Sequence, residues 1–229
     1  MRYSNIRTAE FIRRPNRFIA HVLLDGEEVI CHVKNTGRLR ELLLPGATVF
    51  LEESANPARK TQFDLVGVLR GDEVVNIDSQ APNQAVGEWL RKGGLFEDVS
   101  YVKAEARYGD SRFDFYIESV SGRKAFLEVK GVTLLQDGVA RFPDAPTTRG
   151  VKHIGELVKC LEDGYEAYIL FLLEMKGSKW MEPNDATHPA FGQALREAVA
   201  KGVQMLAYDC LVTPDRLEVD QLVEVRILE

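Results

Sequence analysis

The sequence contains few cysteines, and this shortage excludes two classes of protein. Its 229 residues include only three, Cys31, Cys160 and Cys210, and these are widely dispersed. No pair has the close spacing of zinc ligands, and an odd number does not complete a disulfide framework. Reduced, dispersed cysteines are typical of a reducing compartment, so we expect a cytoplasmic protein.

Long hydrophobic runs are also missing. The longest apolar run covers residues 168–173, far below the roughly 20 apolar residues that a membrane-spanning helix requires. Residues 1–5 do not lead into an apolar signal core. We therefore expect no membrane association.

The chain lacks an overall positive charge, since its formal net charge is -6. This excludes a generic basic nucleic-acid binder. The charge is unevenly distributed, because residues 1–70 hold 11 Lys and Arg against 8 Asp and Glu, whereas the remainder holds 18 against 27. A mildly basic first part can meet a polyanion, and an acidic second part can gather carboxylates around a metal.

The first third of the sequence has the pattern of short β-strands. Alternating apolar residues in 18–24 and 29–33 flank Asp25-Gly26, which is a strong hairpin signal. A short helix is expected at 39–44, ended by Pro45-Gly46. Further strands are expected at 48–51, 63–69 and 73–77. About five short strands and one small helix predict an OB-like β-barrel over residues 1–80.

The pattern changes near residue 78, and residues 81–229 predict a second domain. Helices are expected at 84–92, at 151–163 and at 189–201, and strands at 100–107, 112–118, 124–129, 165–173 and 203–208. The strand–helix–strand order at the end implies parallel strands. The loop 133–150 separates the early strands from the second helix. We predict a restriction-endonuclease-like mixed sheet flanked by helices, in a two-domain α/β (α+β) protein.

Three charged residues of this second domain form a candidate catalytic site. Glu128 and Lys130 are two residues apart on one predicted strand, so their side chains point to the same face. Asp114 lies on the preceding predicted strand. We expect Phe113, Phe115, Leu127 and Val129 to supply the buried face. Two carboxylates can hold Mg²⁺, with Mn²⁺ as a substitute, and a nearby lysine can stabilise charge on a phosphate.

Other residues extend or weaken this interpretation. Glu88, on the preceding predicted helix, is a candidate third metal ligand, and Glu105 is a possible further carboxylate or an ion-pair partner of Arg107 or Arg112. In isolation, a Glu-x-Lys pair is an ordinary solvated ion pair. The presence of Asp114 on the neighbouring strand is what makes a phosphodiesterase site plausible.

The junction between the long loop and the second helix is a candidate phosphate site. Its sequence runs from Thr147 to His153. The threonines can cap the helix, and free backbone N–H groups with Arg149 or Lys152 can receive a phosphate. The alternative is an ordinary helix cap with basic surface residues. His153 alone does not identify a general base.

Basic residues also gather at one end of the predicted hairpin. Arg13, Arg14 and Arg17 precede its first strand, and Asn35 and Arg38 follow its second strand. The two groups lie at the same end of an antiparallel hairpin, where arginine and asparagine can contact DNA. Phe18 offers a stacking face. The alternative is a polar turn with solvated arginines.

Five segments occur in order along the chain: RPNRFIAHV, NTGRLRELLLPG, YGDSRFDFYI, AFLEVKGVTL and PTTRGVKHIGEL. With these segments, the chain closely resembles the sugar fermentation stimulation protein A family over nearly its full length. The resemblance implies an N-terminal OB-like domain and a C-terminal domain like the PD-(D/E)xK nucleases. It maps the nuclease motif onto Asp114, Glu128 and Lys130, with Phe113 in place of the proline. It also implies sequence-nonspecific DNA binding and a regulatory link to sugar (maltose) metabolism in bacteria.

The sequence leaves three functions open. The protein is a DNA-binding protein with a Mg²⁺-dependent nuclease site, a non-catalytic DNA-binding regulator on a nuclease scaffold, or an oligosaccharide-binding protein, since OB barrels also bind sugars. The intact Asp114, Glu128 and Lys130 favour the first. Whether the chain forms a homodimer is also left open.

Overall fold

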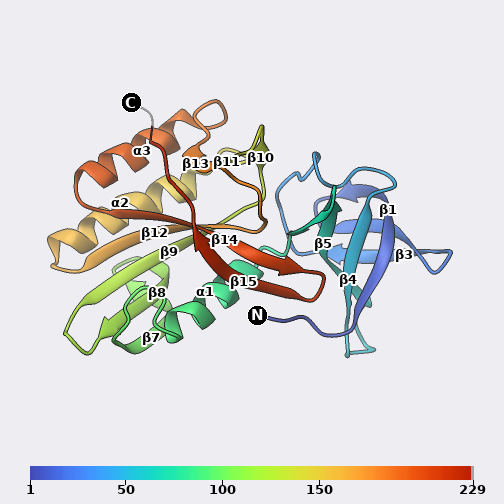
Figure 1. Ribbon diagram of the computed structural model, residues 1–229, viewed down its shortest axis with the longest axis horizontal. Coiled ribbons are helices and arrows are strands. Elements are labelled where there is room, and N and C mark those ends of the chain that lie inside the picture. The colour runs from blue at the N-terminus through green and yellow to red at the C-terminus, as the bar shows by residue number, and fades with distance from the viewer. Residues whose placement is uncertain (228–229) are drawn as a thin grey trace.

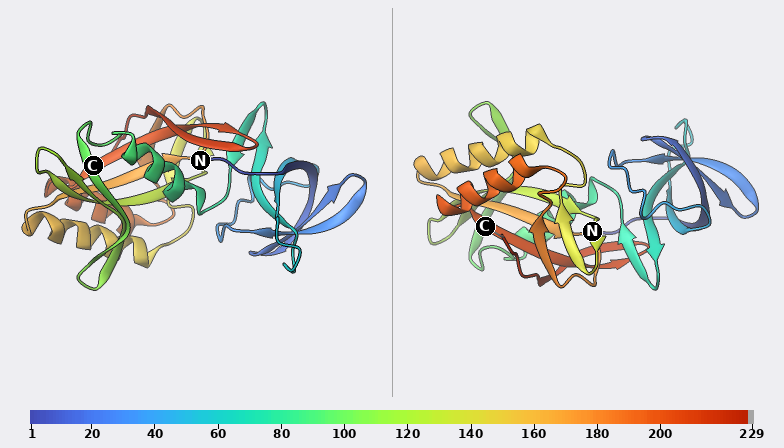
Figure 2. Two further views of the ribbon diagram at one scale, coloured as in Figure 1. Left: turned by 90° about the horizontal axis from the view of Figure 1, so that it is seen from below. Right: turned by 90° about the horizontal axis from the view of Figure 1, so that it is seen from above.

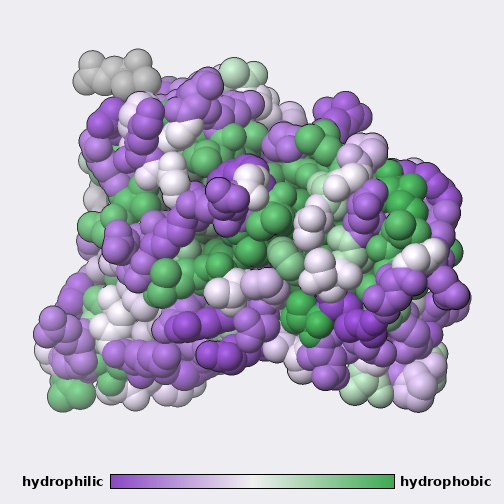
Figure 3. All heavy atoms as spheres, turned by 45° about the vertical axis from the view of Figure 1, so that its right-hand side comes forward, coloured by the Kyte–Doolittle hydropathy of each residue, from purple (hydrophilic) through white to green (hydrophobic). Residues whose placement is uncertain are grey.

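The structure, a computed structural model, describes residues 1–227, which form two lobes (Figure 1). The first lobe holds six strands and the second holds three helices and nine strands. On the face shown in Figure 3, hydrophilic side chains dominate the outer margins and apolar ones gather towards the middle. Within residues 1–227, no helix is both long and apolar enough to cross a membrane.

The first lobe is a closed β-barrel. Its strands are β1 (Ile6–Asn16), β2 (Ile19–Leu24), β3 (Glu27–Val33), β4 (Thr48–Glu53), β5 (Phe63–Arg70) and β6 (Glu73–Asn76). The sheet order is β3-β2-β1-β4-β5-β6, and parallel pairing of β3 with β5 closes the ring. Fully buried side chains such as Val22, Leu51 and Leu65 fill the interior. Closure leaves few free strand edges, and it confirms the predicted OB-like barrel.

The hairpin of β2 and β3 is confirmed, but the strand before it was not predicted. Leu24 pairs with Glu27, and the two turn residues, Asp25 and Gly26, have positive φ angles of 52° and 89°, as a tight hairpin turn requires. β1 includes Arg13, Arg14 and Pro15, residue types that are uncommon in the interior of a strand. Arg13 and Arg14 therefore belong to a further strand before the hairpin, and Arg17 lies in the turn between β1 and β2.

The helix predicted at residues 39–44 is wrong, because the structure has a single turn there. Leu42 and Leu43 both donate backbone hydrogen bonds to the Leu39 carbonyl, at 3.2 and 2.9 Å. Leu39 has a positive φ of 49°, outside the right-handed helical region. The three leucines are buried in the apolar core of the barrel. Their helical spacing reflects this packing and does not propagate into a helix.

The second lobe is a six-stranded mixed sheet between helices. Its order is β15-β14-β12-β9-β8-β7, in which β9, β12 and β14 are parallel. The elements are α1 (Ala81–Arg91), β7 (Val99–Tyr108), β8 (Ser111–Ser119), β9 (Lys124–Val132), α2 (Thr148–Glu162), β12 (Glu166–Leu173), α3 (Pro189–Ala200), β14 (Gln204–Thr213) and β15 (Arg216–Leu222). Figure 1 shows α1 on one side of the sheet and α2 and α3 on the other. The predicted mixed sheet flanked by helices is confirmed.

β12 shows why this sheet is covered on both sides. Tyr168 and Leu170 pack in the cluster that includes α1, whereas Ile169 and Phe171 pack in the cluster that includes α2 and α3. A strand buried on both faces is apolar at every position. The uninterrupted run in the sequence therefore encodes a central strand.

Two features of the second lobe were missed. The predicted loop 133–150 contains β10 (Leu135–Gln136) and β11 (Val139–Phe142), which form a small sheet with β13 (Trp180–Pro183). The strand β15 was also absent from the prediction. These strands are short or carry charged side chains, so their apolar alternation is weak.

The two lobes share contacts at the start of the chain. The Tyr3 N–H donates to the Asp215 carbonyl at 2.8 Å, and the Met1 amino group donates to the Leu217 carbonyl at 2.7 Å. The first residues therefore pack on the second lobe before the chain enters the barrel, as Figure 2 shows. Conversely, Met175, which follows β12 of the second lobe, packs in the apolar core of the barrel.

Candidate active site

Asp114 lies where two neighbouring strands separate. β8 pairs with β9 from Glu118 to Phe115, and the pairing ends there. Beyond this point Asp114 Oδ2 accepts the backbone N–H of Val129 at 2.7 Å, and Oδ1 accepts the Asn83 amide at 2.7 Å. The carboxylate thus occupies the gap between the strands and links β8 to β9 and α1.

Near this separation, two aromatic residues of β8 pack on different sides of the sheet, although they were predicted to share one face. Phe113 packs in the cluster that includes α2, whereas Phe115 packs in the cluster that includes α1. Both rings are buried, as expected, but they lie in different cores. A regular strand would have placed residues 113 and 115 on one face, so the prediction of a shared face is wrong.

Glu128 is the centre of a buried polar cluster. Its Oε1 lies 2.5 Å from the Lys130 ammonium and 2.5 Å from His153 Nδ1. Arg149 Nε donates to His153 Nε2 at 3.3 Å, which leaves the ring hydrogen on Nδ1 to be donated to Glu128. β9 supplies the acid and the lysine, and α2 supplies the histidine and the arginine.

The second oxygen of Glu128 is available for a cation. Oε2 is buried and has no hydrogen-bond partner in the structure, an arrangement that costs free energy unless a ligand satisfies the oxygen. Carboxylate oxygens are the donors that Mg²⁺, Ca²⁺ and Mn²⁺ prefer. Within residues 1–227, no three His, Cys, Asp or Glu side chains form a ready-made metal cluster. Mg²⁺ commonly uses one or two carboxylates together with waters and substrate phosphates, so the Asp114 and Glu128 donor set fits this cation.

The two carboxylates have different electrostatic environments. Burial, reinforced by the negative charge of Glu128, raises the pKa of Asp114 above its ordinary value. Burial also opposes ionisation of Glu128, but the hydrogen bond from His153 and the positive charge of Lys130 outweigh it and lower its pKa. Glu128 is therefore the more readily ionised of the two, and a cation beside both would favour the ionised form of Asp114.

Asp114, Glu128 and Lys130 line one cavity of about 250 Å³. The same cavity is lined by Arg149 and His153 from α2 and by Glu105 and Arg112 at its rim. The structure thus brings the predicted trio together beneath several basic side chains. The chemistry available is cation binding by carboxylates and charge stabilisation by lysine and arginine.

The other two carboxylates named from the sequence are engaged elsewhere. Glu88, a predicted metal ligand, lies 3.0 Å from the Met1 amino group. It lines a neighbouring cavity that shares Asn83, Glu105 and Asp114 with the cavity of Glu128 but does not include Glu128 itself. Glu105 forms a 2.8 Å ion pair with Arg112. Its positive φ of 54° is unusual for a residue other than glycine, and its side chain lies at the rim shared by both cavities.

The start of α2 has the predicted threonine cap. Thr147 Oγ1 accepts the Gly150 N–H at 3.0 Å. Arg149, one turn before His153, lines the carboxylate cavity, whereas Lys152 is exposed and does not line it. Of the two basic residues, Arg149 is the one placed to meet a phosphate in the cavity.

In the barrel, the two predicted basic groups meet through Arg14. Its guanidinium donates to the backbone carbonyls of Arg17, Asn35, Gly37 and Arg38 at 2.6 to 3.1 Å. Asn35 is likewise engaged, since its side chain bonds the Ile77 carbonyl and the Gly37 N–H. These contacts give both residues a structural role.

The remaining barrel residues differ in their availability. Arg13 pairs with Glu28 at 2.8 Å. Arg17 and Arg38 are exposed, and Phe18 is 52% exposed. Arg17, Phe18 and Arg38 are thus exposed at the end of the hairpin that Arg14 holds together. They are the barrel residues best placed for DNA. Their contact with DNA remains a prediction.

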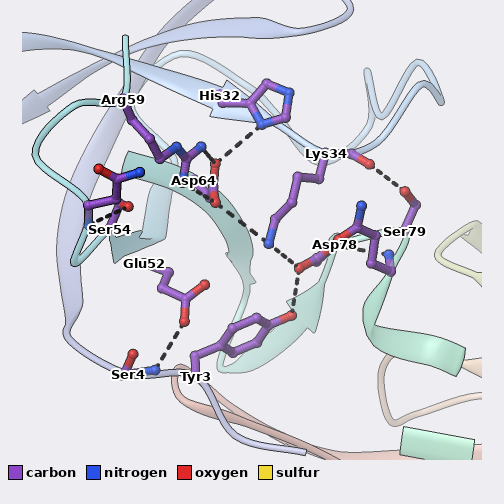
Figure 4. Close-up of polar contacts among 12 residues, drawn as sticks. Tyr3, Ser4, His32, Lys34, Glu52, Ser54, Arg59, Asp64, Asp78 and Ser79 are labelled. Carbon is purple, nitrogen blue, oxygen red and sulfur yellow. Dashed lines mark hydrogen bonds and ion pairs between the residues drawn. The ribbon is translucent and has the colours of Figure 1, made fainter. Parts of the chain in front are cut away.

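A polar network that the sequence did not reveal fixes the linker between the lobes (Figure 4). Lys34 Nζ lies 2.8 Å from Asp78 Oδ2 and 3.7 Å from Asp64. Asp78 also accepts the Gln80 N–H at 3.0 Å, immediately before α1. Tyr3 donates to Asp78, and burial raises the pKa of its hydroxyl. The network holds the start of α1, which carries Asn83, against the carboxylate cavity.

Two domain families match the chain in order. The model of the SfsA N-terminal OB domain matches residues 12–77, and the model of the sugar fermentation stimulation protein RE domain matches residues 80–216. The boundary between the matches agrees with the change of lobe near residue 78.

Homologous proteins match the chain over nearly its whole length. The chain is 52% identical over 225 residues to a sugar fermentation stimulation protein homolog from Clostridium beijerinckii, covering 98% of this chain and 99% of that protein. It is 54% identical over 227 residues to a homolog from Ruminiclostridium cellulolyticum, covering 99% and 100%. A solved structure of Pyrococcus furiosus SfsA in complex with Ca²⁺ is similar, with a TM-score of 0.89, 29% identity, and coverage of 99% of this chain and 98% of that chain.

Proposed function

The chain belongs to the sugar fermentation stimulation protein family, and we propose that it is a sequence-nonspecific DNA-binding protein whose second domain is a Mg²⁺-dependent phosphodiesterase. One observation carries the enzymatic part: Glu128, which lines the same cavity as Asp114 and Lys130, has a buried carboxylate oxygen without a hydrogen-bond partner. A buried oxygen of this kind is suited to a cation. The SfsA relative complexed with Ca²⁺ supports divalent-cation binding in this family.

Each residue of the cavity has a task in this proposal. Asp114 and Glu128 would hold the cation, which when bound supplies Lewis-acid polarisation of a phosphodiester. Lys130, held by Glu128, stabilises negative charge that develops on the phosphate and orients the attacking water. His153 donates to Glu128 and fixes the orientation of the carboxylate.

The DNA-binding part rests on charge and exposure. Arg149 places a positive charge in the carboxylate cavity, and Arg17 and Arg38 present exposed charges on the barrel beside Phe18. Such side chains bind the phosphate backbone with little sequence preference. Lys152 and Arg13 would add weaker contacts at the edges. A regulatory role in sugar metabolism, with maltose as the sugar, is part of the proposal, and the name of the relatives, which mentions stimulation of sugar fermentation, supports a link to sugar metabolism.

A second candidate is a non-catalytic DNA-binding protein on the same scaffold. It is favoured by the contacts of Asp114, because both of its carboxylate oxygens already accept hydrogen bonds from the protein. Under this alternative Asp114 would only link β8 to β9 and α1. The unpartnered oxygen of Glu128 favours the enzyme.

The experiment that separates them is cleavage of end-labelled single-stranded and duplex DNA with Mg²⁺ or Mn²⁺. We expect cleavage by the unaltered protein, its loss with a chelator, and a decrease of ~100-fold or more in Asp114→Asn. Asp110→Asn, an exposed position in the β7–β8 turn, is the matched control and should cleave normally. DNA binding without cleavage under all conditions would establish the non-catalytic alternative.

A further inference from the structure

A second cavity adjoins the carboxylate cavity at the junction of the two lobes. The two share Ser79, Pro82 and Gly131 as lining residues. The barrel contributes Asn35, and the second domain contributes Phe142, Asp144 and Glu174. We call this space the junction pocket. A ligand held in it would lie next to a phosphate held in the carboxylate cavity.

Glu174 is the unusual group of the junction pocket. It is 2% exposed, and its Oε2 is buried without a hydrogen-bond partner. Burial, together with the negative charge of nearby Asp78, raises the pKa of Glu174 well above its ordinary value. An acid in this environment is kept in its neutral form, and a neutral carboxyl can both donate and accept a hydrogen bond.

The close packing around Glu174 keeps its carboxyl in place. A Cβ on Gly131 would lie 2.5 Å from Glu174 Oε1 and 2.9 Å from the Pro82 ring. Glycine at this position therefore allows the carboxyl to approach β9 closely. At the other end, a Cβ on Gly37 would lie 2.8 Å from Asp144 Oδ2, so Asp144 approaches the barrel turn with equal closeness.

The composition of the junction pocket indicates its ligand. Arg141 also lines the pocket, but its guanidinium is already paired with Glu182 at 2.8 Å. The remaining charged group, Asp144, would repel a second phosphate. Within residues 1–227 no cluster of three metal-ligating acids, histidines or cysteines is present here or elsewhere. Its volume of about 120 Å³ is well above the roughly 10–15 Å³ that one water molecule needs, so the pocket admits a ligand larger than water. Pro82 and Phe142 supply apolar walls, and Glu174 and Asp144 supply polar edges.

We propose that the junction pocket binds the unstacked nucleobase of a nucleotide that flanks the phosphate in the carboxylate cavity. A nucleobase is uncharged and planar, and its edge carries amino donors and ring acceptors. Glu174 bonds that edge as donor or acceptor, and Asp144 accepts from an amino group. Proteins read unstacked bases with the same combination of apolar faces and edge hydrogen bonds.

This inference rests on the proposed function, and it adds the class of substrate. A base can enter the junction pocket only after leaving its stack, which is unfavourable in an intact duplex. The subsite therefore selects single-stranded or locally unpaired DNA. It also assigns a role to Asp144 and Glu174, which take no part in the cation site.

The test uses short single strands in which one base at a time is removed, with the phosphate backbone left intact. Affinity is measured with Ca²⁺ in place of Mg²⁺ to limit turnover, and the cleaved bond is located separately with Mg²⁺. We expect removal of one base beside that bond to weaken binding by ~10-fold or more, since holding one base contributes about 1–3 kcal/mol. Removal of distant bases should have a smaller effect.

Variants then assign the effect to the junction pocket. In Glu174→Leu the penalty for the missing base should fall to less than ~3-fold, and Glu174→Gln, which keeps a donor and an acceptor, should preserve part of it. Asp144→Ala changes an exposed residue at the rim and should also reduce the penalty, which provides a test if the Leu variant does not fold. Glu197→Gln, an exposed exchange on α3, is the control.

The outcomes separate the two proposals. The junction-pocket inference is overturned if removal of each base beside the cleaved bond leaves the affinity unchanged. It is also overturned if removal of a base weakens binding equally in the unaltered protein, in Asp144→Ala and in the Glu174 variants. Either result leaves the proposed phosphodiesterase intact. Absence of both DNA binding and cleavage overturns the proposed function and the subsite together.

Discussion

Asp114 takes the place of a strand partner, because its Oδ2 accepts the Val129 N–H at 2.7 Å where β8 and β9 stop pairing. The bond holds the carboxylate between the strands, in the cavity that contains Glu128 and Lys130. A local break in a sheet thus creates the space for the candidate cation site. The cost is a carboxylate buried close to another one.

That cost predicts a trade between stability and activity at Asp114. Burial and the charge of Glu128 raise the pKa of Asp114, so its ionised form destabilises the cation-free protein at neutral pH. Asp114→Asn removes the charge, and the Asn83 amide can rotate to pair with it. We expect the melting temperature without divalent cations to rise by ~2–4 °C, as about 1 kcal/mol would produce in a protein of this size. A lower melting temperature would mean that Asp114 is principally a structural link.

Substitution of Lys130 should impair catalysis without impairing cation binding. Lys130→Met keeps the apolar stem and removes the ammonium group that lies 2.5 Å from Glu128. Because Lys130 is not a cation ligand in this account, we expect Ca²⁺ affinity to be kept or increased while DNA cleavage falls by ~100-fold or more. The measurements are calorimetric titration and a cleavage time course. Equal loss of both would assign Lys130 to the integrity of the site.

The exposed arginines of the barrel should control the salt dependence of DNA binding. Arg17→Ala and Arg38→Ala should each weaken binding and lower the slope of log affinity against log salt by about 1. Lys201→Ala, exposed at the end of α3, is the control. Arg14→Ala should instead lower stability, because it removes hydrogen bonds to four backbone carbonyls. Unchanged salt slopes would remove the barrel from the DNA interface.

Glu174 should make stability depend on pH. Its pKa in the folded protein lies well above the ordinary value of 4.5, so the folded state holds a proton that the unfolded state has released. The free energy of unfolding should therefore fall as pH rises from about 4.5 through the folded pKa. Glu174→Gln cannot ionise and should show a weaker decline, with greater stability than the unaltered protein at neutral pH. Denaturant unfolding across pH 4.5–8 measures this, and parallel pH curves for the two proteins would refute it.

Local periodicity accounts for much of what the sequence could predict. The two-residue spacing of Glu128 and Lys130 predicted a shared face, and their 2.5 Å contact confirms it. The apolar run of β12 predicted a strand, and the Asp25-Gly26 signal predicted a hairpin. In each case the information lies within a few residues.

Contacts between distant residues explain what was missed. Asn83 bonds Asp114 across 31 positions, and His153 bonds Glu128 across 25; no local pattern encodes either pair. Arg14 looked like a surface charge because three of its four carbonyl partners lie 21 to 24 positions further along the chain. The role of His153 could have been suspected only from its place one turn after Arg149 at the start of a helix.

The central claim is that Glu128, and not Glu88, holds the cation, and calorimetric titration of Ca²⁺ tests it most directly. The unaltered protein should bind Ca²⁺, and Glu128→Gln should lose that binding, because the exchange removes the charge of the unpartnered oxygen. Glu88→Gln, at the position paired with the Met1 amino group, should bind Ca²⁺ as the unaltered protein does. Undiminished binding by Glu128→Gln, or loss of binding in Glu88→Gln alone, would contradict the account.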